Sequence, residues 1–235
     1  MYNLPQKLLA EFFGTFAVVF VAAGTISASQ CLASQGQGSP DWLVAAAAYG
    51  LSYGVLRVAV ARISGAHLNP AVTAGFWVTR RLGTLQSIGY WGAQILGSLV
   101  AAYLLVAILP DAGWRERALG AITPDLASGV TRMQGMAIEG VLTFLLVFVV
   151  FATTADAQAE IGRAGGFAAG GALVAAVLMA GPFTGGSLNP ARSFGPAFVT
   201  RHWDNHGVYW VGPLLGGVLA AVLYDWAFRR DRSPA

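Results

Sequence analysis

The sequence predicts an all-α integral membrane protein, in which six transmembrane helices form two related copies of one three-helix unit. Composition is the first reason, because 56% of the 235 residues are hydrophobic, 11% are charged and the mean hydropathy is +0.60. In a soluble domain roughly a quarter of all residues are charged, so this chain has too few charged residues to cover a water-exposed surface. The other two reasons are long uncharged segments and an internal repeat.

Two long uncharged segments and four further apolar stretches mark the six spans. Between Arg81 and Asp111 lie 29 residues without charge, and between Arg163 and Arg192 lie 28. A helix needs roughly 20 residues to cross the hydrocarbon, so each gap holds one full span. Four further apolar stretches meet the same criterion, and they cover about 6–28, 41–62, 132–154 and 207–229.

Basic residues predict the orientation. With a cytoplasmic N-terminus, the inner side of the membrane receives Lys7, Arg62, Arg80, Arg81, Arg163, Arg229, Arg230 and Arg232, and the outer side receives Arg115, Arg117, Arg132 and Arg201. This excess of inner charge predicts that both termini are cytoplasmic. Glu11 inside the first apolar run argues against a cleaved secretory signal. The short termini and the lack of targeting signals suggest the inner membrane of a bacterium.

Three motifs occur twice and in the same order. The second copies of the Glu-x-x-x-Thr-Phe, Asn-Pro-Ala and Tyr-Trp motifs follow the first at offsets of 128, 120 and 119 residues, with first residues at Glu11 and Glu139, Asn69 and Asn189, and Tyr90 and Tyr209. We therefore expect one channel domain over 1–235, with repeats at 1–109 and 130–230 and a connecting loop at 110–129. Because each copy holds three spans, the second is inverted, and inverted repeats place a pathway near the midplane.

Each Asn-Pro-Ala motif is a helix-start signal that follows a short glycine-containing loop. Asparagine is a preferred N-cap and proline a preferred first helical residue, and the two motifs consist of Asn69, Pro70 and Ala71, and of Asn189, Pro190 and Ala191. A helix from Pro70 to about Thr79 spans roughly 15 Å, half of a roughly 30 Å hydrocarbon core. The sequence thus predicts two half-helices that enter from opposite faces and meet at the centre.

Two helix N-termini aimed at one midplane position suggest a channel for uncharged molecules. Each terminus carries about half a positive charge, which repels cations, and the asparagine amides can donate to passing oxygen atoms. Channels that exclude protons and cations with half-helix dipoles are a known use of this arrangement, aquaporins being the example. A pair of ordinary capped helices is the alternative, and the second, inverted Asn-Pro-Ala makes it improbable.

The segments 63–73 and 189–197 resemble the two signature loops of the aquaporins, or major intrinsic proteins, and the resemblance covers essentially the whole chain. It implies an hourglass of six transmembrane helices plus two re-entrant half-helices. It also implies a homotetramer with one pore per subunit, which lies in the lipid bilayer, conducts water and excludes protons and ions. No cofactor and no nucleic-acid partner is implied.

The resemblance also implies a selectivity filter outward of the two asparagines. Its four positions fall on Tyr49, Val177, Gly186 and Arg192. An arginine inside a span is costly and usually functional, and here it adds a fixed positive charge and donors for water. Strict water channels usually have histidine at the position of Val177, so valine together with Gly186 predicts a wider, less polar constriction.

Other markers favour the water channels instead. Glycerol-conducting relatives typically have aspartate after the filter arginine, whereas this chain has Ser193, followed by Ala197 and the pair Tyr209 and Trp210. The filter residues thus favour a wider solute range, whereas these other markers favour a strict water channel. We expect a water channel that also admits small neutral solutes such as glycerol, hydrogen peroxide or ammonia.

Glu11 and Glu139 are acids in the middle of spans, where a charge is costly and normally paired. One interpretation makes them ion-coupling sites of a secondary transporter, which is the alternative function. The family resemblance makes them buried acceptors for backbone N–H groups of the two irregular loops, which need such partners in a membrane. We favour the second role because a symmetric pair suits symmetric loops.

The remaining polar residues indicate neither an enzyme nor a metal site. No nucleophile and base converge, and one cysteine with three histidines cannot form a typical zinc site. His67 is expected to line the inner pore, and Cys31 to be inert near the outer end of the first span. Arg62 is expected to contact lipid headgroups or tune the inner vestibule, and Arg57 has no assignment. A structural junction protein is a third possible function, but such a protein would not need the residues of a pore.

Overall fold

The computed structural model describes residues 2–36, 41–108, 124–155 and 164–228. Within these residues six helices are long and apolar enough to cross a membrane, which confirms the predicted class. They are α1 (Leu4–Ser34), α2 (Trp42–Ser64), α4 (Thr84–Ile108), α6 (Arg132–Val150), α7 (Ala164–Thr184) and α9 (Val208–Phe228). A π-helical turn, η1 (Phe151–Ala155), continues α6. The first span is longer than predicted at both ends.

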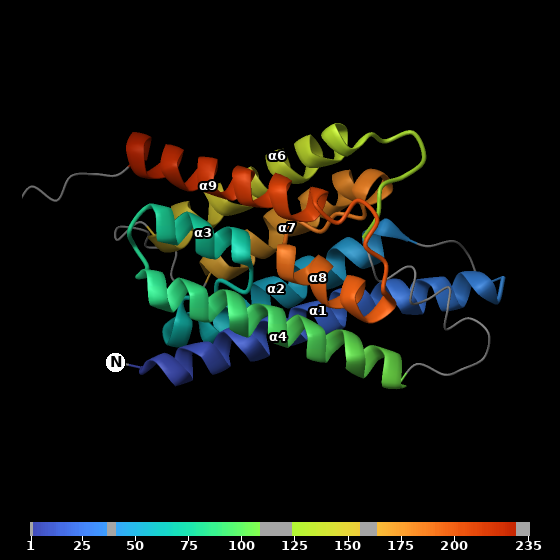
Figure 1. Ribbon diagram of the computed structural model, residues 1–235, viewed down its shortest axis with the longest axis horizontal. Coiled ribbons are helices and arrows are strands. Elements are labelled where there is room, and N and C mark those ends of the chain that lie inside the picture. Colours follow the sequence, from blue (N-terminus) through green and yellow to red (C-terminus); the bar gives the residue numbers. More distant parts are fainter. Residues whose placement is uncertain (1, 37–40, 109–123, 156–163, 229–235) are drawn as a thin grey trace, which may run out of the picture.

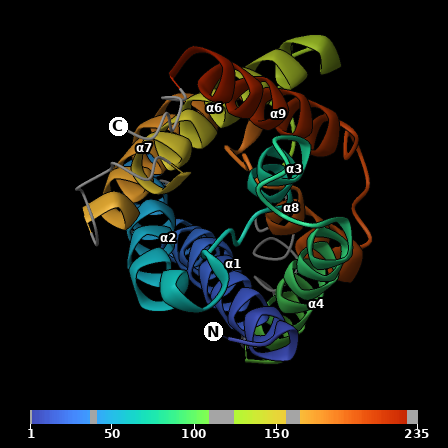
Figure 2. The same ribbon diagram turned by 90° about the vertical axis from the view of Figure 1, so that its left-hand side faces the viewer.

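The described residues also include two short helices, α3 (Pro70–Val78) and α8 (Pro190–Thr200). Both begin at the proline of an Asn-Pro-Ala motif, as predicted, and Asn69 and Asn189 are their N-caps. In Figure 1, α3 lies in the left half of the molecule and α8 in the right half. Figure 2 shows both inside a ring formed by the six long helices.

The two halves of the chain are inverted relative to each other. In Figure 1, α1 runs from left to right, whereas its counterpart α6 runs from right to left. The contacts repeat with the inversion, because α1 packs on α4 as α6 packs on α9. Each half-helix packs mainly on the opposite repeat, α3 on α9 and α8 on α4, so the repeats interlock. The predicted boundary of the connecting loop falls partly outside the described residues.

Close helix crossings explain why glycine stands at several contact points. Where α2 crosses α7, a Cβ at Gly50 would lie 2.5 Å from the carbonyl oxygen of Gly170, and a Cβ at Gly170 would lie 2.6 Å from that of Gly50. Any larger residue would force the two backbones apart. Small residues serve such crossings in membranes, and Gly166 also lies at this crossing, where an added Cβ would come within 2.9 Å of the carbonyl oxygen of Gly54.

Candidate functional site: the midplane loops and the outer mouth

The two half-helices meet through their capping asparagines. The Oδ1 atom of Asn69 accepts the backbone N–H of Ala71 at 2.8 Å, and Oδ1 of Asn189 accepts that of Ala191 at 3.0 Å. Each cap satisfies an N–H group that the first helical turn would otherwise leave unpaired. Both asparagines are 1% exposed, so their caps form inside the protein.

Each asparagine also donates to the opposite loop. Nδ2 of Asn69 donates to the carbonyl of Leu188 at 2.9 Å, and Nδ2 of Asn189 donates to the carbonyl of Leu68 at 2.9 Å. These reciprocal bonds bring the N-terminal ends of α3 and α8 together. A side-chain amide has two N–H groups, so one of the two on each asparagine is used in this way.

Buried carboxylates hold the backbone of both loops. Oε1 of Glu11 accepts the N–H of His67 at 2.9 Å, and Oε2 accepts that of Leu68 at 2.7 Å. Glu139 accepts the N–H groups of Ser187 at 3.0 Å and Leu188 at 2.6 Å. Both glutamates are fully buried, and irregular backbone at this depth is tolerated only when such partners satisfy it.

Several loop residues adopt the left-handed backbone conformation, which turns the loop carbonyls away from the glutamates. Ala66, Leu68 and Leu188 have φ of 50°, 54° and 52°, and the loops begin with Gly65 and Gly185 at 91° and 76°. With the N–H groups directed at one carboxylate, the carbonyls of Leu68 and Leu188 are available to the opposite asparagines. The loop geometry thus presents a row of acceptors near the half-helix tips.

Two tyrosines fix the starts of the loops, and sequence reasoning did not assign them this role. The hydroxyl of Tyr90 donates to the carbonyl of Ser64 at 2.6 Å, and that of Tyr209 donates to the carbonyl of Thr184 at 2.8 Å. Ser64 and Thr184 are the last residues of α2 and α7. The signal was present, since the Tyr-Trp pair repeats at nearly the same offset as Asn-Pro-Ala.

The four predicted filter residues lie around the loop that precedes α8 and the first turn of that helix. The hydroxyl of Tyr49 donates to the carbonyl of Ser187 at 2.8 Å, and its ring centroid is 6.0 Å from Cζ of Arg192. Val177 lies against Gly186, because a Cβ added there would come within 3.3 Å of the valine. Arg192 is 1% exposed and lies in the first turn of α8.

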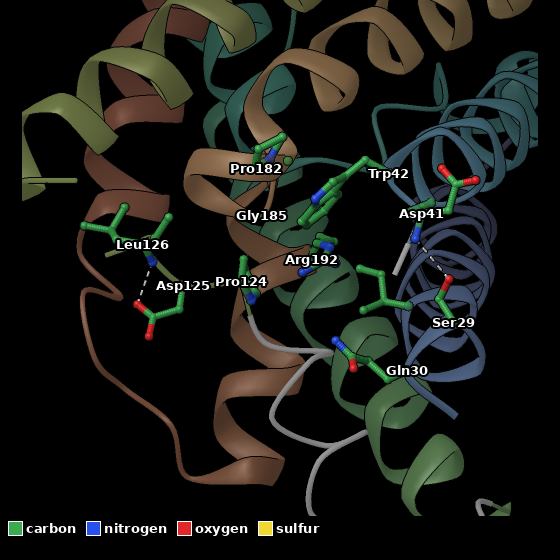
Figure 3. Close-up of a pocket in the computed structure, with 14 residues that line it drawn as sticks. Ser29, Gln30, Asp41, Trp42, Pro124, Asp125, Leu126, Pro182, Gly185 and Arg192 are labelled. Carbon is green, nitrogen blue, oxygen red and sulfur yellow. Dashed lines mark hydrogen bonds between the residues drawn. The ribbon is translucent and has the colours of Figure 1, made fainter. Parts of the chain in front are cut away.

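A cavity of about 280 Å³ reaches Arg192 from the end of the molecule where α2 begins and α7 ends. Figure 3 shows Arg192 among Trp42, Gly185 and Pro124, with Asp125 toward the rim. The wall includes Ala45 and Gly181 from the ends of α2 and α7. Ser29, Gln30, Asp41 and Asp125 also line the cavity. A solute in it therefore meets apolar and polar side chains and the buried guanidinium of Arg192, toward which acceptor oxygen atoms are drawn.

A polar cluster holds the rim of this cavity. Asp125 accepts hydrogen bonds from Asn205 Nδ2 at 3.0 Å and from the N–H of Leu126 at 2.7 Å, and pairs with His202 Nε2 at 3.0 Å. Burial opposes ionisation of Asp125, but these hydrogen bonds outweigh it and hold its pKa below the usual value. The cluster joins the segment before α6 to the segment between α8 and α9. No motif in the sequence indicates this cluster.

His67 lies in the loop that precedes α3, and Arg57 contacts this loop. Nδ1 of His67 is 3.1 Å from Oγ1 of Thr73, and its ring packs against Phe76 at 4.5 Å. Arg57 is 2% exposed and donates to the carbonyl of Ala66, whereas Arg62 is exposed. Cys31 lies in the last turn of α1, where its Sγ accepts from Gln35 at 3.3 Å.

Comparison with known proteins agrees with this architecture. The family model of the major intrinsic proteins matches residues 2–224. Aquaporin TIP4-4 from Zea mays is 44% identical over 95% of this chain and 86% of its own, and Probable aquaporin TIP3-2 from Arabidopsis thaliana is 40% identical over 94% and 83%. The X-ray structure of the aquaglyceroporin from Plasmodium falciparum superposes with a TM-score of 0.79, at 23% identity, over 96% of this chain and 97% of that one. The chain belongs to the major intrinsic protein family.

Proposed function

We propose that the protein is a passive channel, which conducts water between the tips of α3 and α8 and excludes protons and other ions. The observation that carries this proposal is the pair of reciprocal hydrogen bonds between the asparagines and the opposite loops. They hold two helix N-termini against one midplane position, where their dipoles disfavour any cation. Water that passes there exchanges hydrogen bonds with fixed amides and carbonyls.

The outer filter selects solutes before they reach the asparagines. Arg192 supplies the positive charge and the hydrogen-bond donors, and Tyr49 supplies one aromatic wall. Val177 and Gly186 add neither a donor side chain nor much bulk. The constriction should therefore pass water together with small neutral solutes such as glycerol, hydrogen peroxide and ammonia. The similar proteins include one named as an aquaporin and one named as an aquaglyceroporin. These names support a solute range that includes both water and glycerol.

The alternative of an ion-coupled transporter finds no support in the geometry. A coupling carboxylate must bind and release its ion in each cycle, whereas the oxygens of Glu139 accept the N–H groups of Ser187 and Leu188 and the hydroxyl of Thr184. Release of those bonds would leave buried N–H groups unpaired, at a cost of about 1–3 kcal/mol each. We assign Glu11 and Glu139 to support of the loops, and His67 to the inner pore wall.

The assembly and location follow from the same proposal. The protein is a multi-pass integral membrane protein, and the family resemblance favours a homotetramer in which each subunit has its own pore. Exposed apolar side chains such as Leu51, Val141 and Leu219 cover the outer faces of the long helices, which suits contact with lipid or with neighbouring subunits. We assign the termini to the cytoplasm from the inner excess of basic residues, and the membrane to the bacterial inner membrane.

Flux into proteoliposomes tests the proposed solute range. Stopped-flow light scattering should show rapid passive uptake of water and slower uptake of glycerol and hydrogen peroxide by the wild-type protein. Val177→His narrows the filter but supplies a donor, so water flux should persist while glycerol permeability falls about tenfold, equivalent to 1.4 kcal/mol of barrier. Val177→Leu is the matched control, since it narrows the filter without a donor and should slow both solutes. Water flux without glycerol flux in the wild type would remove the broader solute range.

A further inference from the structure

The inverted repeat assigns a counterpart to each residue of the outer filter. The two capping asparagines are 120 residues apart, and the contacts between Gly50 and Gly170 on α2 and α7 have the same offset. Subtraction or addition of this offset pairs each outer position with one in the inner half. The counterparts of Val177, Gly186, Arg192 and Tyr49 are Arg57, Ala66, Val72 and Ala169.

The contacts of the structure match this pairing. In the outer half, Val177 lies against Gly186 of the loop that precedes α8. In the inner half, Nη1 of Arg57 donates to the carbonyl of Ala66 at 2.6 Å, in the loop that precedes α3. The same helix position therefore meets the same loop position on both sides of the asparagines.

Arg57 is as enclosed as the outer filter. It is 2% exposed, compared with 3% for Val177 and 1% for Arg192, so it is buried to the same degree as these two predicted filter residues. The described partners of its guanidinium are neutral, namely the carbonyl of Ala66, the hydroxyl of Tyr53 at 3.3 Å and Oγ1 of Thr154 at 3.0 Å. Arginine keeps its charge in proteins. A buried cation that pairs only with neutral groups is costly, so its presence usually marks a function.

One guanidinium nitrogen still has a donor to offer. Nε of Arg57 is buried and has no hydrogen-bond partner among the described residues. Buried donors are nearly always paired, with water if not with protein. A passing solute oxygen is a partner of the right chemistry, because the other two nitrogens already hold the side chain in place.

We propose that Arg57, opposite the small side chains of Ala66, Val72 and Ala169, forms a second selectivity constriction in the inner half of the pore. This inference rests on the proposed channel function and adds a specificity-determining residue to it. The outer filter is widened by Val177 and Gly186, whereas the inner position carries the bulky arginine. The inner constriction, in series with the outer one, is then the step that limits glycerol and larger neutral solutes.

The test compares Arg57→Val, which gives the inner position the residue of its outer counterpart, with the wild type in proteoliposomes. The glycerol-to-water permeability ratio should rise about fivefold, which corresponds to about 1 kcal/mol of barrier. The double variant Val177→His, Arg57→Val should keep the glycerol-to-water ratio of the single variant Val177→His. In both proteins the outer filter limits the flux of glycerol. A gain that persists in the double variant would indicate a general leak and would overturn the proposal.

A milder variant keeps the test decisive if Arg57→Val does not fold. Thr154→Val removes the hydrogen bond to Nη2 at an exposed position and should raise the ratio in the same direction by a smaller factor. A ratio unchanged in every folded variant, while the wild type conducts water, overturns the inner constriction and leaves the channel function standing. Failure of the wild type to conduct water would instead overturn the channel function itself.

Discussion

Asn69 and Asn189 each donate a side-chain N–H to the carbonyl that directly precedes the other asparagine, and both bonds measure 2.9 Å. The two re-entrant segments are therefore cross-linked at their tips. Each asparagine caps its own half-helix and at the same time fixes the position of the opposite one. Loss of either side chain should disturb both halves of the centre.

Asn69→Ala should lower both the stability and the water permeability of the channel. The change removes an N-cap, worth about 1 kcal/mol. It also leaves the buried carbonyl of Leu188 with only the longer hydrogen bond from Thr143 Oγ1 at 3.5 Å, and a typical lost hydrogen bond costs about 0.5–1.5 kcal/mol. Thermal unfolding in detergent, followed by circular dichroism, measures the first effect, and vesicle shrinkage measures the second. Asn205→Ala at the outer rim is the matched control and should leave water flux nearly unchanged. Wild-type stability and flux in Asn69→Ala would contradict the cross-link.

Glu139→Gln should impair folding of the second loop without any effect on ion coupling. A neutral amide replaces a carboxylate that accepts the N–H groups of Ser187 and Leu188, and hydrogen bonds to a charged group contribute about 1.5–3 kcal/mol each. We expect a lower unfolding temperature and less correctly folded protein on size-exclusion chromatography. Glu11→Gln, the equivalent change in the first repeat, should behave alike. Flux that depends on a proton gradient in the wild type, and is uncoupled in Glu139→Gln, would favour the transporter.

The rim of the outer cavity should loosen in acid. The pKa of Asp125 is lowered in the folded protein because its hydrogen bonds outweigh the effect of burial. Its contribution to stability is therefore fully present above the unfolded pKa of about 3.8 and is lost as the pH falls through the lower, folded value. Unfolding temperatures between pH 5 and pH 2 should fall less steeply in Asp125→Asn, which has no carboxylate to protonate. An identical acid slope in both proteins would contradict the assignment.

Mercurial reagents should not block the pore through Cys31. The residue lies in the last turn of α1, and it is absent from the residues that line the outer cavity, among which α1 contributes Ile26, Ser29 and Gln30. Water flux should be equal before and after treatment with mercuric chloride. Strong inhibition that disappears in Cys31→Ser would show that this part of α1 reaches the conducting path.

The fold was predictable because its determinants are local or periodic. Two uncharged gaps and four further apolar stretches located the six spans. The Asn-Pro pairs located the first residue of α3 and of α8, since N-caps act within one helical turn. The repeat offset predicted the inversion. The extension of α1 to Ser34 and the π-helical turn after Val150 were not predictable, because tertiary contacts decide where such helices end.

The site was predictable where the same residue type stands in both repeats. Glu11 and Glu139 were recognised as a pair, and the structure places each against its own loop. The partners of Arg57 depend on long-range contacts, such as the one with Thr154, that spacing alone does not show. The cluster of Asp125 with His202 also joins segments far apart in the chain. Only the 120-residue offset could have linked Arg57 to Val177.

The central claim is that neutral molecules pass between the two capped half-helix tips while ions do not. Its most direct test is stopped-flow water permeability in proteoliposomes that also contain a pH-sensitive dye. We predict water flux with a low activation energy, and proton flux no greater than in protein-free vesicles under an imposed pH gradient and a potassium–valinomycin potential. Proton conduction by the wild-type protein, or water flux no faster than through lipid alone, would contradict the account.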